Sequence, residues 1–346
     1  MPRNFSAHLP KRCVDLSGSD SYADPIFEQA ARQALAHWPV QVAELKFISQ
    51  SENIVFKVRS AQEENFVLRL HRPGYNSLAQ LQSERVWTAA LNDAGISAPV
   101  GVPASSGEQF IKFEDRYAGM LHWSEGTTLQ PEFYATKDAR TRSDYLEELG
   151  RLIARMHEQA SAWTPPQGFE RRNLDTDGLV GEAPSWGRFW EVPEIDRAAR
   201  DRLSNLRKAL QQILSGYEIQ ARATQQFSLI HADLHFGNVI RTGNNLHVID
   251  FDDTAFGFHA FDLAVAINEF QTLPAYDEIA DALITGYSAV RPSQAEKMQA
   301  WLPTFHVVRT CSILGWLHDR PEMGRRNHFT EFSKIALNAA TKLGYI

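Results

Sequence analysis

The sequence predicts an α+β fold of two lobes, in which a small antiparallel sheet precedes a larger, mainly helical part. Two observations lead to this class. Between residues 41 and 123, segments rich in Val, Ile, Leu and Phe alternate with polar breaks. Beyond residue 124, apolar residues recur mainly at helical spacing. We therefore expect an N-terminal lobe of residues 1–123 and a C-terminal lobe of residues 124–346.

The first lobe is expected to hold a leading helix, a sheet and a second helix. The leading helix opens at Asp24-Pro25, with apolar residues at helical spacing over residues 27–35. A helix over residues 78–92 is expected to stop at Ala94-Gly95. Strands are predicted at residues 42–49, 53–59, 65–71, 109–113 and 117–123.

The second lobe is expected to be helical except for one insert. A strand-loop-strand segment is predicted at residues 227–253, and the Pro- and Gly-rich residues 163–187 are predicted to form an extended surface loop or an insertion. Helices are predicted at residues 144–159, 196–217, 277–290 and 294–318.

Composition and charge limit the classes of partner. Nucleic acids and anionic membranes are bound by basic surfaces, so the net charge of −7 argues against both. Cys13 and Cys311 have no metal-binding spacing, so neither a disulfide framework nor a zinc site is expected. Residues 1–16 lack the apolar core of a signal peptide, and no apolar run of about 18 residues occurs. We expect a cytoplasmic protein with a small-molecule partner.

The residues that carry chemistry lie in and after two neighbouring apolar segments. His231, Asp233 and Asn238 form an H-x-D-x-x-x-x-N pattern, and Asp250 ends the next segment. Phosphoryl transfer needs a carboxylate to orient the attacking hydroxyl and oxygen ligands to hold Mg²⁺ across the phosphates. Asp233 is predicted to be the catalytic base, Asn238 and Asp250 the Mg²⁺ ligands, and His231 a hydrogen-bonding brace. A capping Asp and a turn Asn beside a buried strand are the alternative.

The segments HADLHFGNVI and VIDFDDTAFGFHAFDLA resemble the signature of the aminoglycoside phosphotransferase/choline kinase superfamily, which is related to the protein kinases. Within it, the chain is similar to type II homoserine kinases and to bacterial stress-response Ser/Thr kinases. The resemblance implies a protein-kinase-like fold that uses ATP and Mg²⁺. It also implies that Asp262 starts a helix and ties the catalytic loop in place, with an ordinary helix N-cap as the alternative.

The resemblance also assigns nucleotide contacts to the first lobe. Ser51 and Asn53 occupy the turn that covers the phosphates, although no G-x-G-x-x-G pattern is present and a plain polar turn is the alternative. Val67 is expected to face the adenine and Arg69, in the place of the kinase lysine, to face the phosphates. Glu84 is the expected ion-pair partner of Arg69, with a surface helix glutamate as the alternative.

A hinge and a further carboxylate complete the implied nucleotide site. Residues 120–123 are expected to form the hinge, where the backbone of Leu121 and Trp123 reads the adenine edge; an ordinary edge strand is the alternative. Asp252 stands where protein kinases have the glycine of D-F-G. It is expected to support the metal ligands or to bind a second metal, with an exposed turn aspartate as the alternative. Arg69 in place of lysine also leaves open a catalytically weak pseudokinase.

A different class of function competes for the same segment. His231, Asp233 and His235 form an H-x-D-x-H pattern that would suit a metal-dependent hydrolase. His247 and His259 are the available further ligands, but they fit no ordered ligand pattern.

No motif identifies the phosphate acceptor or the oligomeric state. The resemblance favours homoserine or another small amino alcohol, with a Ser/Thr protein or an aminoglycoside as alternatives. Seven residues of the second lobe are candidates for acceptor recognition, and the alternative is that they occupy ordinary positions in the helix core or on the helix surface. These candidates are Phe258, Phe261, Glu269, Phe270, Trp301, Arg309 and Trp316.

Overall fold

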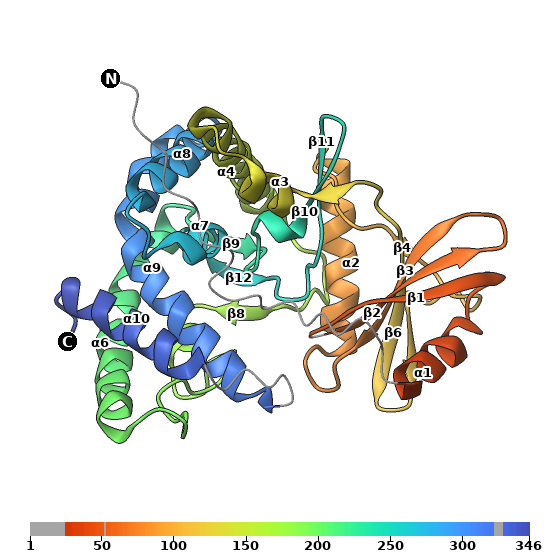
Figure 1. The fold of residues 1–346 in the computed structure, drawn as a ribbon, viewed down its shortest axis with the longest axis horizontal. Helices are drawn as coiled ribbons and strands as arrows, with labels where there is room; N and C mark the ends of the chain where they lie inside the picture. The colour runs from red at the N-terminus through yellow and green to blue at the C-terminus, as the bar shows by residue number, and fades with distance from the viewer. Residues whose placement is uncertain (1–24, 52, 322–327) are drawn as a thin grey trace.

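The computed structural model describes residues 25–51, 53–321 and 328–346. It contains a sheet lobe, on the right of Figure 1, and a larger helical lobe on the left, so the predicted two-lobed α+β class is confirmed. The predictions for residues 1–16, for Cys13 and for Asp24 lie outside the described residues. The division at residues 123/124 stays a prediction.

The sheet lobe is antiparallel throughout its described strands. β1, β2, β3 and β6 are neighbours in that order, and both β4 and β5 pair with β6. Alternate residues of the central strands point into an apolar cluster against which α1 packs, as the period-two pattern requires. The elements are α1 (Pro25–Leu35), β1 (Val42–Gln50), β2 (Asn53–Ser60), β3 (Asn65–His71), α2 (Leu78–Asp93), β4 (Gly101–Val102), β5 (Phe110–Phe113) and β6 (Arg116–His122).

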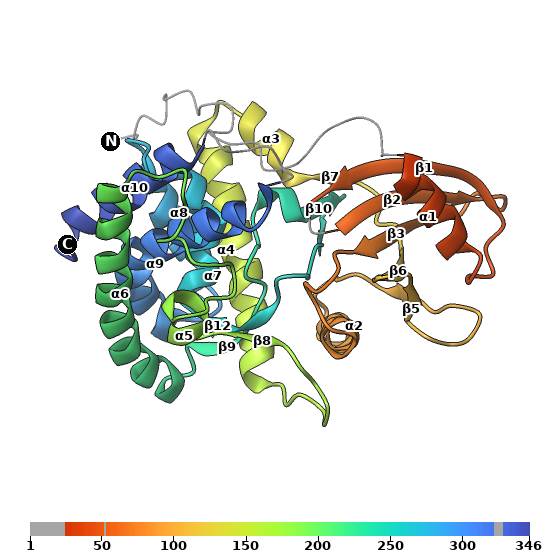
Figure 2. The ribbon, with the colours of Figure 1, turned by 90° about the horizontal axis from the view of Figure 1, so that it is seen from below.

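Helix α2 connects the two lobes. Ser77 caps it through a capping box with Gln80, and the chain leaves it at Gly95, whose φ is 73°. α2 is seen end-on beside the sheet in Figure 2. The apolar side of α2 packs into the core of the helical lobe, where Trp87 is 0% exposed and donates to Gln159 Oε1 at 3.0 Å. α2 therefore contacts both lobes, through Glu84 to Arg69 and through Trp87 to Gln159.

The helical lobe holds two small sheets among its helices. One has the order β11-β10-β7 and the other β8-β12-β9. The strands are β7 (Thr127–Thr128), β8 (Arg172–Leu174), β9 (Phe227–Ile230), β10 (Val239–Thr242), β11 (Asn245–Val248) and β12 (Ala255–Phe258). The helices are α3 (Leu129–Ala135), α4 (Ala139–Ala162), α5 (Thr176–Val180), α6 (Arg197–Ala223), η1 (Phe236–Asn238), α7 (His259–Ile267), η2 (Asn268–Phe270), α8 (Tyr276–Ser288), α9 (Pro292–His318) and α10 (Phe329–Lys342).

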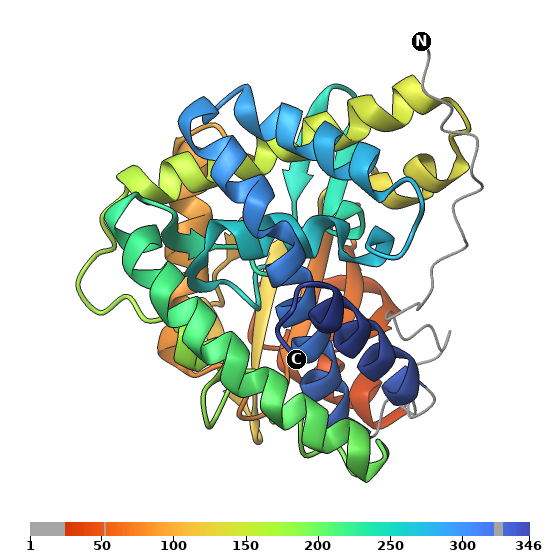
Figure 3. The same ribbon diagram turned by 90° about the vertical axis from the view of Figure 1, so that its left-hand side faces the viewer.

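Two glycines allow α4 and α8 to approach closely where they cross, at the top of Figure 3. A Cβ added at Gly150 would lie 2.0 Å from the carbonyl oxygen of Leu283, and one added at Gly286 would lie 1.9 Å from that of Glu147. The two backbones therefore touch with no room for a side chain on either helix. Within the described ranges, no helix has the length and apolar character that crossing a membrane requires.

The structure corrects one predicted loop. Residues 163–187 contain β8 and α5 rather than an extended surface loop alone. β8 forms because its backbone pairs with β12, a strand more than eighty residues later in the chain. A local sequence pattern does not contain that partner.

Candidate active site

The buried carboxylate of Asp262 holds the loop between β9 and η1 in place. Asp262 Oδ2 accepts from the backbone N–H of His231 at 3.1 Å, and Oδ1 accepts from that of Ala232 at 2.7 Å. Ala232 has a φ of 67°, a left-handed conformation that costs an alanine energy and needs such support. Asp262 thus ties the loop, as predicted. The expected helix start at Asp262 and the N-cap alternative are both wrong, because α7 begins at His259 after the N-cap Phe258 and Asp262 lies inside its first turn.

His231 braces the same loop through both ring nitrogens. Its Nε2 donates to the carbonyl oxygen of Ile249 at 3.0 Å, which leaves Nδ1 to accept from the N–H of Asp233 at 3.3 Å. Burial lowers the pKa of His231, so the neutral ring that this pattern requires is favoured. The geometry is that of the predicted brace, and it joins the Asp233 loop to the segment that carries Asp250.

Asp233 presents its carboxylate at the surface of this loop, with 25% of the side chain exposed. Its Oδ1 forms an ion pair with Arg309 Nη2 at 2.5 Å, and Oδ2 lies 3.8 Å from Nε2 of His235. Burial raises the pKa of Asp233, and Arg309 opposes that shift. The group is thus a carboxylate whose basicity depends on a neighbouring cation.

Asn238 and Asp250 lie beside Asp233. Asn238 Nδ2 donates to the backbone oxygen of Asp233 at 2.9 Å, which leaves its amide oxygen as a possible metal ligand. The N–H of Ile249 donates to the Asn238 carbonyl at 2.9 Å, and this bond brings Asp250 next to Asn238. Asp250 has a φ of 65° and a side chain that is 48% exposed. Such a backbone strain in a non-glycine residue is common at functional sites.

The donor set at Asn238 and Asp250 fits a hard divalent cation. Desolvation and the negative charge of Asp252 raise the pKa of Asp250 well above its ordinary value, although Arg69 opposes the shift. A carboxylate such as Asp250, which resists ionisation in this way, would be stabilised in its charged form by a bound cation. Carboxylate and amide oxygens are the ligands that Mg²⁺ takes from proteins.

Arg69 lies at the centre of a buried ionic network. Its Nη1 contacts Glu84 Oε1 at 2.9 Å, its Nη2 contacts Asp252, and Asp250 Oδ1 lies 3.9 Å away. Glu84 is 0% exposed and Asp252 is 3% exposed, so the surface-helix alternative for Glu84 and the exposed-turn alternative for Asp252 are both wrong. Burial opposes ionisation of Asp252, but Arg69 and His71 outweigh it and hold its pKa well below the ordinary range.

The turn between β1 and β2 reaches the same network. The side-chain amide of Asn53 donates to Asp252, and Asn53 is 6% exposed. Ser51 N–H donates to the Asn53 carbonyl at 3.0 Å. The structure therefore joins Asn53 to the carboxylate cluster, a contact that the sequence does not predict.

The expected adenine positions lie on β3 and β6. Val67 and Leu121 are register partners across these strands. β6 pairs with β3 on one side and with β4 and β5 on the other, so the edge-strand alternative is wrong. The N–H of Trp123 donates to Asn65 O at 3.1 Å, which leaves its carbonyl rather than its amide for a nucleotide contact.

The histidines of the hydrolase alternative do not converge. His235 Nδ1 accepts from Gly237 N–H, His247 hydrogen-bonds Ser97 at 2.7 Å, and His259 hydrogen-bonds Ser228 at 2.7 Å. Among residues 25–51, 53–321 and 328–346, no three His, Cys, Asp or Glu side chains form a metal-binding group. The H-x-D-x-H pattern therefore belongs to a hydrogen-bonded loop.

Of the residues considered for acceptor recognition, Arg309 contacts the candidate base directly. Phe258, Phe261 and Phe270 are at most 2% exposed and belong to the core, so the core alternative is correct for these three. Trp301 stacks on Tyr217 with ring centroids 3.9 Å apart. The other two are partly buried: Glu269 accepts from the Tyr134 hydroxyl, and Trp316 lies under the Arg320 guanidinium.

Arg171 is a site residue that the sequence analysis missed. It donates to the carbonyl oxygens of Thr254 at 2.6 Å, Asp252 at 2.6 Å and Gln80 at 3.0 Å. It therefore clamps the Asp252 segment to α2. Burial lowers its pKa to about 10, which leaves it charged at neutral pH. It lies in the segment predicted as a surface loop, and no local signal marks it.

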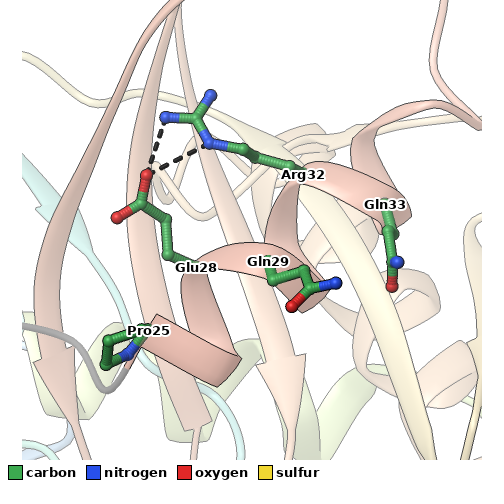
Figure 4. A pocket seen from close by; sticks show the side chains of 5 residues that line it. All are labelled: Pro25, Glu28, Gln29, Arg32 and Gln33. Carbon is green, nitrogen blue, oxygen red and sulfur yellow. Dashed lines mark hydrogen bonds and ion pairs between the residues drawn. The ribbon is translucent and has the colours of Figure 1, made fainter.

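An open pocket elsewhere on the molecule does not involve these residues. It lies on the outer side of α1 and is lined by Pro25, Glu28, Gln29, Arg32 and Gln33 (Figure 4). Glu28 and Arg32 in it pair with each other at 2.7 Å and stay exposed. None of the candidate site residues described above lines this pocket.

Comparison with known proteins gives one family and several related kinases. The sequence profile described as phosphotransferase enzyme family matches residues 44–299. The amicoumacin kinase of Bacillus subtilis is 23% identical over 304 residues, which cover 84% of each chain. The homoserine kinase of Methylobacterium radiotolerans is 26% identical over 227 residues, 61% of this chain and 60% of that protein.

Among solved structures, the microcompartment-associated aminopropanol kinase is similar to this chain. It superposes with a TM-score of 0.77 and 27% sequence identity, over 91% of this chain and 98% of the other. The match confirms the predicted protein-kinase-like fold.

Proposed function

This chain belongs to the phosphotransferase enzyme family and is a kinase, and on that premise we propose that it transfers the γ-phosphate of ATP to the hydroxyl of a small molecule. A homoserine-like amino alcohol is the favoured acceptor, because the relatives include a homoserine kinase and an aminopropanol kinase. One observation carries the proposal. The Asp233 carboxylate is fixed beside Asn238 and Asp250, on a loop held by buried hydrogen bonds.

Asn238 and Asp250 would hold Mg²⁺, which when bound neutralises charge on the phosphates. Arg69 would contact the phosphate oxygens from the sheet lobe. Its contacts with Glu84 at 2.9 Å and with Asp252 hold the guanidinium in place. This fixed position supports an active kinase over the pseudokinase alternative.

Asp233 would orient the acceptor and take its proton. The acceptor hydroxyl donates a hydrogen bond to the carboxylate, which directs the oxygen at the γ-phosphorus. As the new P–O bond forms, the bond from the γ-phosphorus to the β,γ-bridging oxygen breaks, ADP leaves and the hydroxyl proton passes to Asp233. A cytoplasmic location, as predicted from the sequence, fits ATP as the donor.

The test is Mg²⁺-dependent ADP release from ATP with homoserine, aminopropanol, choline, an aminoglycoside and a Ser/Thr protein. Replacing the base in the variant Asp233→Asn should lower kcat by about 10²- to 10⁴-fold, while ADP affinity changes little. Asp201→Asn, an exposed aspartate on α6, is the matched control and should keep full activity. Acceptor-stimulated turnover that survives in Asp233→Asn would overturn the assignment.

A further inference from the structure

Arg309 is the charged group nearest to the proposed base, and it belongs to α9 rather than to the catalytic loop. Its Nη2 lies 2.5 Å from Asp233 Oδ1, and its side chain is 14% exposed. The guanidinium carbon lies 5.8 Å from the ring centre of Trp186. An ion pair and an aromatic neighbour thus hold this cation where an acceptor hydroxyl must arrive.

An aromatic residue of α9 and a second cation just beyond the end of this helix follow Arg309. Trp316 lies seven positions after Arg309, a spacing that places both on one side of α9, and Arg320 lies two residues after His318, the last residue of α9. The Arg320 guanidinium lies 4.7 Å from the Trp316 ring and 5.3 Å from that of Tyr75. The Tyr75 hydroxyl contacts Asp253, three residues after Asp250.

Guanidinium groups therefore lie over the rings of Trp186, Trp316 and Tyr75. Arg172 covers Tyr75 as well, at 4.4 Å. A site that binds an acceptor whose only charged group is an ammonium presents aromatic ring faces and carboxylates to that ligand. Here the ring faces carry cations of the protein, and such a surface favours an anion.

The ion pair also limits the base. Arg309 occupies Oδ1 of Asp233, so a hydroxyl that binds there competes with the guanidinium. An acceptor with its own anion would draw the guanidinium to itself and leave Asp233 to the hydroxyl. Before the guanidinium moves, a hydroxyl on Oδ1 and an anion on Nη2, each at a hydrogen-bond distance of about 2.8 Å, would lie no more than about 8 Å apart.

Building on the proposed function, we propose that Arg309 determines acceptor specificity: the acceptor carries an anionic group, a carboxylate or a phosphate, within a few bonds of the hydroxyl that is phosphorylated. Arg309 binds that group through its two-pronged guanidinium. Homoserine and threonine have this chemistry, and aminopropanol and choline lack it.

The experiment compares acceptors that differ only in the anion. The carboxylate pairs are homoserine with 3-amino-1-propanol and threonine with 1-amino-2-propanol, and the phosphate pair is glycerol 3-phosphate with glycerol. The measured quantity is the ratio of kcat/KM within each pair, for the wild type, Arg309→Met and Arg309→Lys. Arg151→Met, which removes an exposed arginine of α4 paired with Glu147, is the control.

We expect the wild type to prefer the anionic member of at least one pair, and Arg309→Met to reduce that preference about 100-fold, mainly through KM. Arg309→Lys should restore part of it. Any effect of Arg309 on the proton affinity of Asp233 changes both members equally and cancels in the ratio. The pair that responds distinguishes carboxylate from phosphate.

An unchanged ratio in Arg309→Met, with equal losses for both members, would overturn the specificity role and leave the proposed kinase intact. Equal use of both members by the wild type would also overturn it. If no acceptor is turned over, calorimetric titration of the same pairs in the presence of ADP tests the role of Arg309 in acceptor binding independently of the reaction. Binding of the anionic member that Arg309→Met abolishes would support the inference although the proposed reaction had failed, and equal binding of both members would refute it.

Discussion

Replacing Glu84 by glutamine should destabilise the protein through the buried network around Arg69. Glu84 is 0% exposed and lies 2.9 Å from Arg69 and 3.2 Å from Arg85. Glu84→Gln keeps the shape of the side chain but removes the negative charge that two buried guanidinium groups share. Burial already lowers the pKa of Arg85 to about 10 with Glu84 in place, so Arg85 depends strongly on this partner.

The expected loss of stability depends on the contacts that Arg69 and Arg85 keep in Glu84→Gln. Removing one member of a buried ion pair costs about 3–5 kcal/mol, because the other charge stays buried without compensation. Arg69 keeps Asp252, and Arg85 keeps the ring of Phe110 at 4.9 Å. We therefore expect the low end of the range, about 3 kcal/mol, from a total stability on the order of 5–15 kcal/mol.

Urea unfolding measures this loss as a lower midpoint at an unchanged m-value. The control is Glu147→Gln, which removes a partly exposed pair with Arg151 at 3.4 Å and should cost less than about 0.5 kcal/mol. KM for ATP should rise in Glu84→Gln because Arg69 loses one of its two supports. A loss below about 1 kcal/mol with an unchanged KM for ATP would refute the view that Glu84 anchors Arg69.

Three further predictions concern helix packing, pH and the metal ligand. Gly150→Ala places a Cβ 2.0 Å from the Leu283 carbonyl oxygen and should cost about 3 kcal/mol in urea unfolding. Gly216→Ala, where a Cβ meets nothing within 4 Å, should stabilise α6 by about 0.5–1 kcal/mol. Burial lowers the pKa of His306 to about 3 from 6.5, so the unfolded chain binds the extra proton and stability falls as the pH drops from 6.5 towards 3. At pH 5 the loss should be about 2 kcal/mol, visible as a smaller difference between pH 7.5 and pH 5 in His306→Gln than in the wild type. In calorimetry, the ATP affinity of Asp250→Asn should be the same with and without Mg²⁺. If Mg²⁺ still raises the ATP affinity of this variant, Asp250 is not the metal ligand.

Local patterns account for the parts of the site that the sequence could predict. Asp233 and Asn238 lie on one loop, and Asp250 follows the β10–β11 hairpin that comes directly after it, so the residues that act together are close in the chain. The Arg69–Glu84 pair is also near in sequence, fifteen residues apart, and the resemblance to a known family indicates the strand and the helix that carry it.

The unpredicted parts of the site depend on contacts across the chain. Asn53 meets Asp252 over 199 positions, and Arg309 meets Asp233 over 76 positions. Arg171 is surrounded in sequence by loop-forming residues, and its role comes from the carbonyl groups that the fold places around it. These contacts are set by the packing of elements that lie far apart in the chain, which residue types and spacing do not encode locally.

The most direct test of the proposed reaction is to identify the fate of the γ-phosphate. Phosphorus NMR of a reaction with ATP, Mg²⁺ and homoserine, or the best acceptor of the panel, should show ADP and a phosphate monoester in equal amounts, and both should form at least about 100-fold more slowly with Asp233→Asn. Release of inorganic phosphate in place of the monoester, or monoester formation by Asp233→Asn at the wild-type rate, would contradict phosphoryl transfer to a hydroxyl that Asp233 activates.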